Sequence, residues 1–411
     1  MSSLPHCARG RRHFKRGIFA APLTRRSQPM PVLKQVTARK ELDLLVRAGL
    51  GVEPIAPALA RVLREVMGAE GCFIGWFDEF GKPAGFFHDS ALVEVQDLFM
   101  NNTKLFTGAN EFTMFSAARK NSAAKVGSMF RPGKAFYKSN TFNLLVKPCG
   151  HHHALDMRVE VNKVTRVVFS LFRPEAHLFS EADAHRLKAL YPVLQMVAFK
   201  PVATPNGENT DRDQIRFART SGPVDADEMG HLLVSADGLR IKMINDQGAA
   251  LLRLTKLFDQ GVLLIKPMTI PPLFIQQLCG QLAPGSAAMA QSQMEVIGGS
   301  LVMTASWLKP VTHAADQESS NDGEAALHSS ILVRIEYFKP VAIGIVRSIS
   351  ELGLSPLQSR IAMFAATGGS RIECAVHHQV SKEALKKHLR EIYAASRCLD
   401  WHELHRTLNA R

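Results

Sequence analysis

Hydrophobic and polar positions follow two different periods between residues 39 and 200. Apolar residues recur at helical spacing from Leu42 to Val66, which predicts amphipathic helices. Shorter strand-like runs follow at Cys72–Phe77, Ala84–Phe87, Leu155–Val161 and Thr165–Phe172, with Gly81–Pro83 and Asn162–Lys163 as hairpin turns. Ser180 then begins another helix with a capping-box pattern, because Asp183 stands three residues later. We therefore predict an antiparallel sheet flanked by N- and C-terminal helices.

Strand-like runs dominate the stretch between residues 229 and 348. A hairpin is expected at Leu232–Ser235 and Leu239–Ile244, around the turn residues Asp237 and Gly238. A helix at Gln247–Leu254 follows, and three further strands are expected at Met294–Ile297, Leu301–Leu308 and Ile331–Phe338. The turn-rich and polar residues 201–228 separate this stretch from the one before. The pattern predicts a second antiparallel sheet in a module of its own.

Residues 349–411 again show sequence patterns that predict helices. Ser355, Ser370 and Ser381 each stand where a serine would cap a helix. The first helix would end near Ala366, the second near residue 379 and the third near Ala395. Two short helices, a tight turn and a longer third helix form a helix-turn-helix. The predicted fold class is therefore α+β, with two antiparallel-sheet modules followed by an all-α domain.

The third of these helices has two distinct faces. Its apolar stripe is Leu385, His388, Leu389 and Ile392, and its charged stripe is Glu383, Lys386, Lys387 and Arg390. A basic face on the second helix of a helix-turn-helix is typical of a protein that reads the major groove of DNA. Charge alone does not distinguish this reading from the alternative, in which the charged face of the helix contacts only water.

The order of residues in this region resembles the LuxR-type helix-turn-helix family. The likeness runs without a gap from Leu354 to Leu404. Matching positions are Leu354, Ser355, Pro356, Gly368, Ser370, Glu373, Ala375, Val380, Ser381, Lys386, His388, Leu389, Ile392, Tyr393, Glu403 and Leu404. The sequence departs from the family pattern at Gln358, His378, Gln379, Ala384 and Arg397. These departures affect the expected sharpness of the turn and one phosphate contact.

The resemblance implies roles for particular residues. Lys386, Lys387 and Arg390 match positions that approach the bases of double-stranded DNA. Residues at helix N-termini, where backbone amides face phosphates, are Ser370, Arg371, Ser381 and Lys382. The family dimerises through its last helix, so Trp401, Leu404 and Leu408 are candidates for a homodimer seam. Alternatively, Trp401 folds back and completes the core of its own domain.

The two sheet modules also carry resemblances. Residues Lys147–Leu155 and Phe172–Pro174 resemble the GAF-like sensor region found before one class of bacterial regulators. The segment Leu232–Leu252 is similar to the opening of a PAS fold. These resemblances imply modules that receive a signal, from an unknown small-molecule ligand or a protein. The alternative is that they serve only in dimerisation or partner contact.

Charge is concentrated at the two ends of the chain. The 411 residues carry 50 basic and 37 acidic side chains, a net charge of +13. Ten basic and no acidic residues fall before residue 41, and nine basic and six acidic ones after residue 349. The start is therefore either a basic arm that touches phosphates or a tail without a core. The expected divisions are 1–38 (arm), 39–200 (GAF-like), 201–228 (linker), 229–348 (PAS-like) and 349–411 (helix-turn-helix).

Several classes of function lack support in the sequence. No apolar run approaches the ~20 residues of a membrane span, and the six cysteines form no CxxC pair, which favours reduced thiols in the cytoplasm. No nucleotide-binding loop or hydrolase motif is present, so we expect neither an enzyme nor a cofactor. Cys149 and His151–His153 suggest a metal cluster, but neighbouring strand residues face opposite sides, so we expect no metal site.

Overall fold

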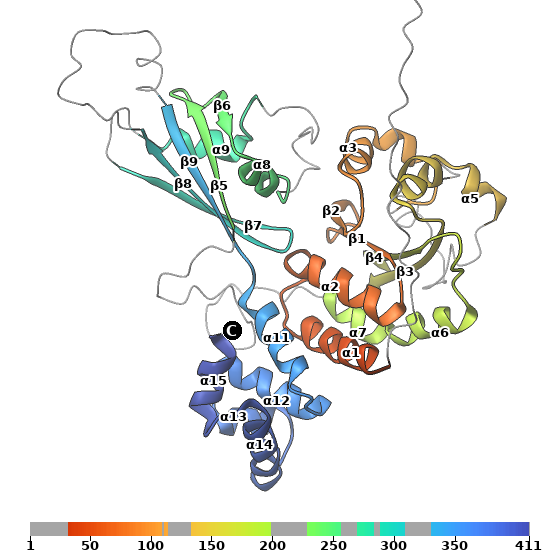
Figure 1. Ribbon diagram of the computed structural model, residues 1–411, viewed down its shortest axis with the longest axis vertical. Coiled ribbons are helices and arrows are strands. Elements are labelled where there is room, and N and C mark those ends of the chain that lie inside the picture. Colours follow the sequence, from red (N-terminus) through yellow and green to blue (C-terminus); the bar gives the residue numbers. More distant parts are fainter. Residues whose placement is uncertain are drawn as a thin grey trace, which may run out of the picture.

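The computed structural model describes residues 32–108, 111–113, 133–198, 228–255, 269–282, 288–308 and 330–410. Helices and sheets are mixed: two antiparallel sheets are followed by a C-terminal helical region (Figure 1). The first sheet module lies on the right of this view, the second at the upper left and the helical region at the bottom. None of the helices in these described ranges has the length and apolar character needed to cross a membrane.

The first module is built on a four-stranded sheet of order β2-β1-β4-β3. Its strands are β1 (Gly71–Phe77), β2 (Pro83–His88), β3 (His153–Val161) and β4 (Val164–Arg173). Alternate residues of β1 face opposite sides, so Cys72 and Ile74 join one core while Phe73 joins another. The strands predicted from the sequence are confirmed, and the turn residues Asn162 and Lys163 both have positive φ, 51° and 65°.

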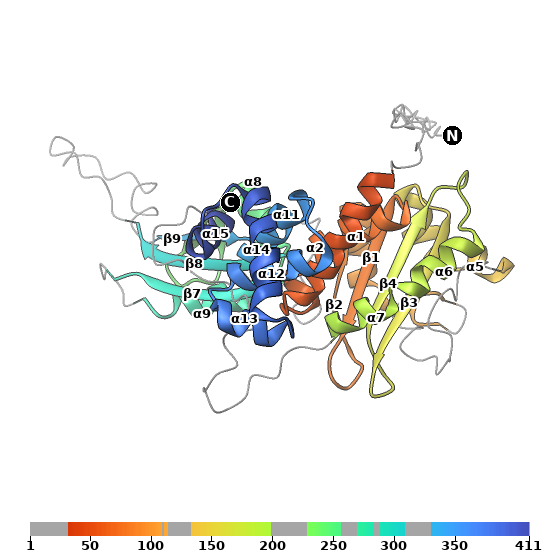
Figure 2. The ribbon, with the colours of Figure 1, turned by 90° about the horizontal axis from the view of Figure 1, so that it is seen from below.

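Helices cover both faces of this sheet (Figure 2). One face packs against α1 (Val32–Arg47), α2 (Val52–Met67), α6 (Glu181–Ala189), α7 (Tyr191–Gln195) and η4 (Met196–Ala198). The other face carries α3 (Val93–Asn101), η1 (Thr103–Phe106), α5 (Lys134–Lys138), η2 (Thr141–Val146) and η3 (Lys147–Cys149). The capping box at Ser180 is present, because its hydroxyl accepts from the Asp183 amide.

The second module has a five-stranded sheet of order β6-β5-β9-β8-β7. Its strands are β5 (Glu228–Ser235), β6 (Ile241–Ile244), β7 (Ala290–Val296), β8 (Gly299–Trp307) and β9 (Ser330–Phe338). α8 (Asp246–Leu252) and α9 (Leu273–Cys279) pack on one face. The predicted hairpins and the helix after them are confirmed, within a few residues at each end.

Five helices form the C-terminal region. They are α11 (Val341–Glu351), α12 (Pro356–Ala366), α13 (Arg371–His377), α14 (Lys382–Ser396) and α15 (Trp401–Asn409). α11 packs against α1, α12 and α15 and shares their hydrophobic core. The second sheet module therefore ends at Pro340 and not at residue 348, because the apolar face of α11 belongs to the helical core.

One further expected boundary differs from the structure, and parts of two expected segments lie outside the described residues. α1 begins at Val32, seven residues before the expected start of the first module, because residues 32–38 continue the amphipathic helix. Residues 1–31 of the expected arm and residues 201–227 of the expected linker lie outside the described residues.

The three parts are in contact through α1 and α2. Lys40 of α1 donates a hydrogen bond to the Leu354 carbonyl before α12, at 2.8 Å. The Gly298 amide, in the β7–β8 turn, donates to the Glu53 carbonyl of α2 at 3.1 Å. The first two helices of the chain therefore contact both the second sheet module and the C-terminal region.

Candidate nucleic-acid interface

Three serines position the helices of the C-terminal region. The hydroxyls of Ser355, Ser370 and Ser381 accept from the backbone amides of Gln358, Glu373 and Ala384, respectively. Each bond satisfies an amide that has no partner within its helix, which stabilises a helix by about 1 kcal/mol. The sequence prediction of three serine-capped helices is confirmed.

The turn between α13 and α14 is tight although it lacks glycine. Gln379 has φ of 53°, in the left-handed region where glycine is favoured. The Val380 amide donates to the Ala375 carbonyl at 3.0 Å and closes the turn. The backbone therefore forms this turn without glycine, at a conformational cost of roughly 1 kcal/mol.

The inner face of α14 is fixed against α12. Leu385, Leu389 and Ile392 are buried in the core of the C-terminal region, as the apolar stripe predicts, and His388 is half-buried. Gln358 of α12 is also buried, and its side-chain amide donates to the Glu391 carboxylate of α14. Packing and this hydrogen bond together hold α14 in one orientation.

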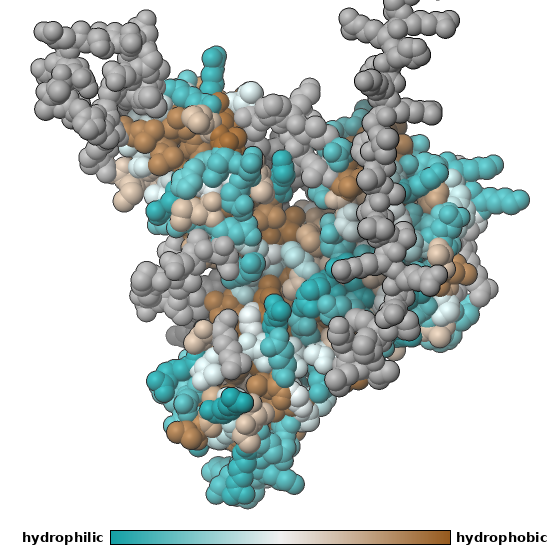
Figure 3. Space-filling view, viewed as in Figure 1, coloured by the Kyte–Doolittle hydropathy of each residue, from teal (hydrophilic) through white to brown (hydrophobic). Residues whose placement is uncertain are grey.

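The outer face of α14 presents the predicted cations to solvent. Lys386, Lys387 and Arg390 are all exposed. Within the described residues, none of the three forms an ion pair or a hydrogen bond. In Figure 3, hydrophilic side chains cover the lower tip of the molecule, where α14 lies in Figure 1. The three cations are therefore free to bind an anionic surface.

The candidate phosphate-binding residues differ in their surroundings. Ser381 and Lys382 are exposed at the start of α14. At the start of α13, in contrast, the Ser370 amide already donates to the Glu373 carboxylate at 2.9 Å. That carboxylate would repel a phosphate, so Ser381 and Lys382 are the stronger pair. Arg371 is exposed and lies beside the Tyr393 hydroxyl, whose pKa is raised mainly by burial.

The expected dimer seam lies inside the chain. Leu404 and Leu408 are 0% and 1% exposed, because α15 packs against α11 and α12. The Trp401 indole donates to the Gly369 carbonyl at 2.9 Å, and Asn409 donates to the Ala366 carbonyl at 3.0 Å. The assignment of these three residues to an exposed seam is therefore wrong, and the alternative, in which Trp401 completes its own domain, describes the structure.

The sequence pattern does not predict that apolar residues of α13 are exposed. Ile372 and Val376 are 70% and 74% exposed and stand four residues apart on one face. Their spacing was visible in the sequence. Periodicity alone, however, does not tell an outward apolar pair from an inward one. They lie on the helix that precedes the turn, beside Arg371.

The histidine run at residues 151–153 does not converge on one point. His151 contacts the Ser90 hydroxyl at 2.9 Å, His152 packs against Tyr137, and His153 contacts the Glu175 carbonyl. No group of three potential metal ligands occurs in the described part of the chain.

Comparison with known proteins finds a likeness to a solved structure. No family model matches the sequence, and no curated protein matches it. Among solved structures, the chain is similar to the nlh2 GAF domain of A. aeolicus in an inactive state. The identity is 15%, the match covers 40% of this chain and 93% of that domain, and the TM-score is 0.24. A likeness of that size carries no argument about fold or function.

Proposed function

We propose that this chain is a cytoplasmic, sequence-specific DNA-binding transcriptional regulator of the LuxR type. The single observation that carries the proposal is the face of α14 described above. It presents three exposed cations, without partners in the described residues, on a helix whose opposite side is buried. The resemblance of residues 354–404 to the LuxR-type pattern supports the same reading.

In this proposal α14 enters the major groove, which is wide enough to admit a helix. Lys386, Lys387 and Arg390 would donate to acceptor atoms on base edges, and guanine offers two of them on one edge. Ser381 and Lys382, at the start of the same helix, would contact backbone phosphates and set the register. α12 and α13 would hold the reading helix without reading bases themselves.

The two sheet modules are proposed to be GAF-like and PAS-like sensors. Their antiparallel sheets, each with helices on at least one face, agree with that layout. The competing proposal is a signal-independent regulator whose modules serve in dimerisation or partner contact. A small molecule retained by the purified protein in native mass spectrometry would favour the sensor.

A homodimer remains part of the proposal, on a surface other than the buried face of α15. Regulators with one helix-turn-helix gain specificity by placing two reading helices on paired half-sites. The proposed partners are therefore double-stranded DNA and a second copy of the chain.

The proposal is tested by selecting binding sites from random double-stranded DNA with the full-length protein. We expect one enriched motif with two-fold symmetry, whose half-sites are spaced about one helical turn apart. If the protein retains DNA but no motif is enriched, its DNA binding is non-specific. That result would contradict the proposal.

A further inference from the structure

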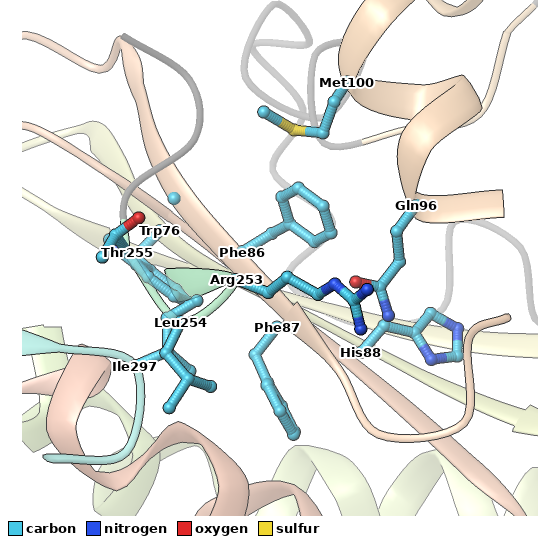
Figure 4. A pocket seen from close by; sticks show the side chains of 11 residues that line it. Trp76, Phe86, Phe87, His88, Gln96, Met100, Arg253, Leu254, Thr255 and Ile297 are labelled. Carbon is cyan, nitrogen blue, oxygen red and sulfur yellow. The ribbon is translucent and has the colours of Figure 1, made fainter. Parts of the chain in front are cut away.

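A cavity lies where the two sheet modules meet. The β7–β8 turn docks on the first module, and the Ile297 amide also donates to the Leu254 carbonyl at 3.2 Å. Between this turn, the end of α8 and strand β2 there is a cavity of about 200 Å³ (Figure 4). Its lining comes from both modules, so anything bound there touches both.

Most of the cavity wall is apolar and aromatic. Trp76, Phe86 and Phe87 line it from the first module, and Leu254 and Ile297 from the second. An apolar cavity of about 150 Å³ is enough to hold benzene. The volume here therefore suits one aromatic ring with a small substituent, and aromatic walls favour stacked or edge-on contact with such a ring.

One polar group in this wall lacks a partner. Trp76 is only 5% exposed, and its indole N–H finds no acceptor in the described part of the chain. The indole lies against Gly85, which also lines the cavity, and a Cβ at Gly85 would collide with it. That nitrogen has almost no accessible surface, so the indole offers the cavity its aromatic ring and not its N–H.

The second polar feature is a cation. Arg253 forms neither an ion pair nor a hydrogen bond within the described residues, and no acidic side chain lines the cavity. In Figure 4 its side chain runs across the cavity toward Gln96 and His88. Burial and the neighbouring His151 lower the pKa of His88 to about 3, so that ring is neutral at pH 7. The cavity therefore carries one positive charge.

We propose that this cavity binds a small aromatic carboxylate. The ring would occupy the apolar part beside Trp76, and the carboxylate would pair with Arg253. Because both modules contribute to the wall, an occupied cavity would favour one relative placement of the two. That the ligand acts as a signal for DNA binding rests on the proposed function; that it binds does not.

The test is calorimetric titration of the full-length protein, without DNA, with three probes of similar shape: benzoate, benzamide and benzylamine. We expect benzoate to bind most tightly and benzylamine least. Arg253→Gln should weaken benzoate binding tenfold or more, since a charged hydrogen bond is lost, and leave benzamide binding unchanged. Arg240→Gln, which removes another exposed arginine of the same module, should leave benzoate binding intact.

A second variant tests the aromatic wall. Trp76→Leu removes the indole ring and keeps an apolar side chain, so benzoate should bind more weakly while thermal unfolding shows a folded protein. Equal affinity for benzoate and benzamide, an unaltered affinity in Arg253→Gln, or no binding of any probe at millimolar concentration would each overturn the site. Since DNA is absent from the assay, these outcomes leave the DNA-binding proposal standing.

Discussion

At the scale of single residues, Gln358 shows how one side chain joins two helices of the C-terminal region. Its side-chain oxygen accepts from the Ser355 amide at 2.7 Å, and its side-chain nitrogen donates to the Glu391 carboxylate. A glutamine can do both at once, whereas an ionised glutamate can only accept. The residue type therefore follows from the carboxylate on the facing helix.

We predict that Gln358→Glu lowers the free energy of unfolding by about 1 kcal/mol at pH 7, because a buried carboxylate then faces the carboxylate of the exposed Glu391 and the hydrogen bond between the two side chains is lost. Denaturant unfolding measures the change. The matched control is the double variant Gln358→Glu with Glu391→Gln, which restores a donor–acceptor pair and should recover most of the loss. A single variant as stable as the parent chain would show that the contact does not hold α14.

Two buried histidines make stability depend on pH. The rings of His88 and His151 stack at 5.9 Å in the first module. Burial disfavours their charged forms and lowers the pKa values to about 3 and about 4. In an unfolded chain the same groups titrate near 6.5. Between pH 6.5 and 4 these histidines are therefore protonated in the unfolded chain and remain neutral in the folded one.

We therefore predict that the free energy of unfolding is highest above pH 6.5 and falls as the pH drops toward 4, by about 1.4 kcal/mol per pH unit for each such histidine. His151→Phe keeps an aromatic ring against Phe172 and should flatten this slope by roughly one proton. The exposed His185→Gln is the control and should leave the slope unchanged. Equal slopes in parent and His151→Phe would contradict the assignment.

At the scale of elements, α15 has a different structural role from the one that its sequence suggests. An apolar stripe indicates that a helix buries one face, but not whether the partner is its own chain or another copy. Here the stripe closes the C-terminal core, and side chains of α15 bond to carbonyls at the end of α12. α15 is therefore part of the core of the C-terminal region.

We predict that Leu408→Ala lowers the free energy of unfolding by about 2–5 kcal/mol, the range for removing a buried leucine side chain. Leu399→Ala is the control, because Leu399 is 86% exposed just before the same helix. Chemical denaturation monitored by circular dichroism measures both. If Leu408→Ala changed the oligomeric state and left stability untouched, the buried assignment would be wrong.

Elements with strong local signals could be predicted, and those fixed by distant contacts could not. The β3–β4 hairpin follows from its alternating strands and the turn at Asn162 and Lys163. The π-helical turn η2 was missed, since it depends on the buried Glu111 carboxylate, which accepts from the Thr141 amide at 2.7 Å. Helical spacing alone predicts that the three cations of α14 share one face, and all three are exposed. The cavity beside Trp76 was not foreseen, because its walls come from segments far apart in the sequence.

At the scale of the whole molecule, the C-terminal region rests on the first module. α1 packs on α11 and α12, so the core of the first sheet continues into that of the C-terminal helices. Figure 1 shows α14 on the side of this assembly that faces away from both sheets. The proposed reading helix is therefore accessible in this arrangement.

The proposed reading of base edges by the outer face of α14 is tested by the affinity of Lys386→Ala and Arg390→Ala for the selected DNA site and for a scrambled one. Lys188→Ala, an exposed charge on α6, is the control. We predict that each α14 variant stays folded and loses about 1–3 kcal/mol of affinity for the selected site, with a smaller loss on the scrambled site. Folded variants that keep the full preference for the selected site would contradict base reading by α14.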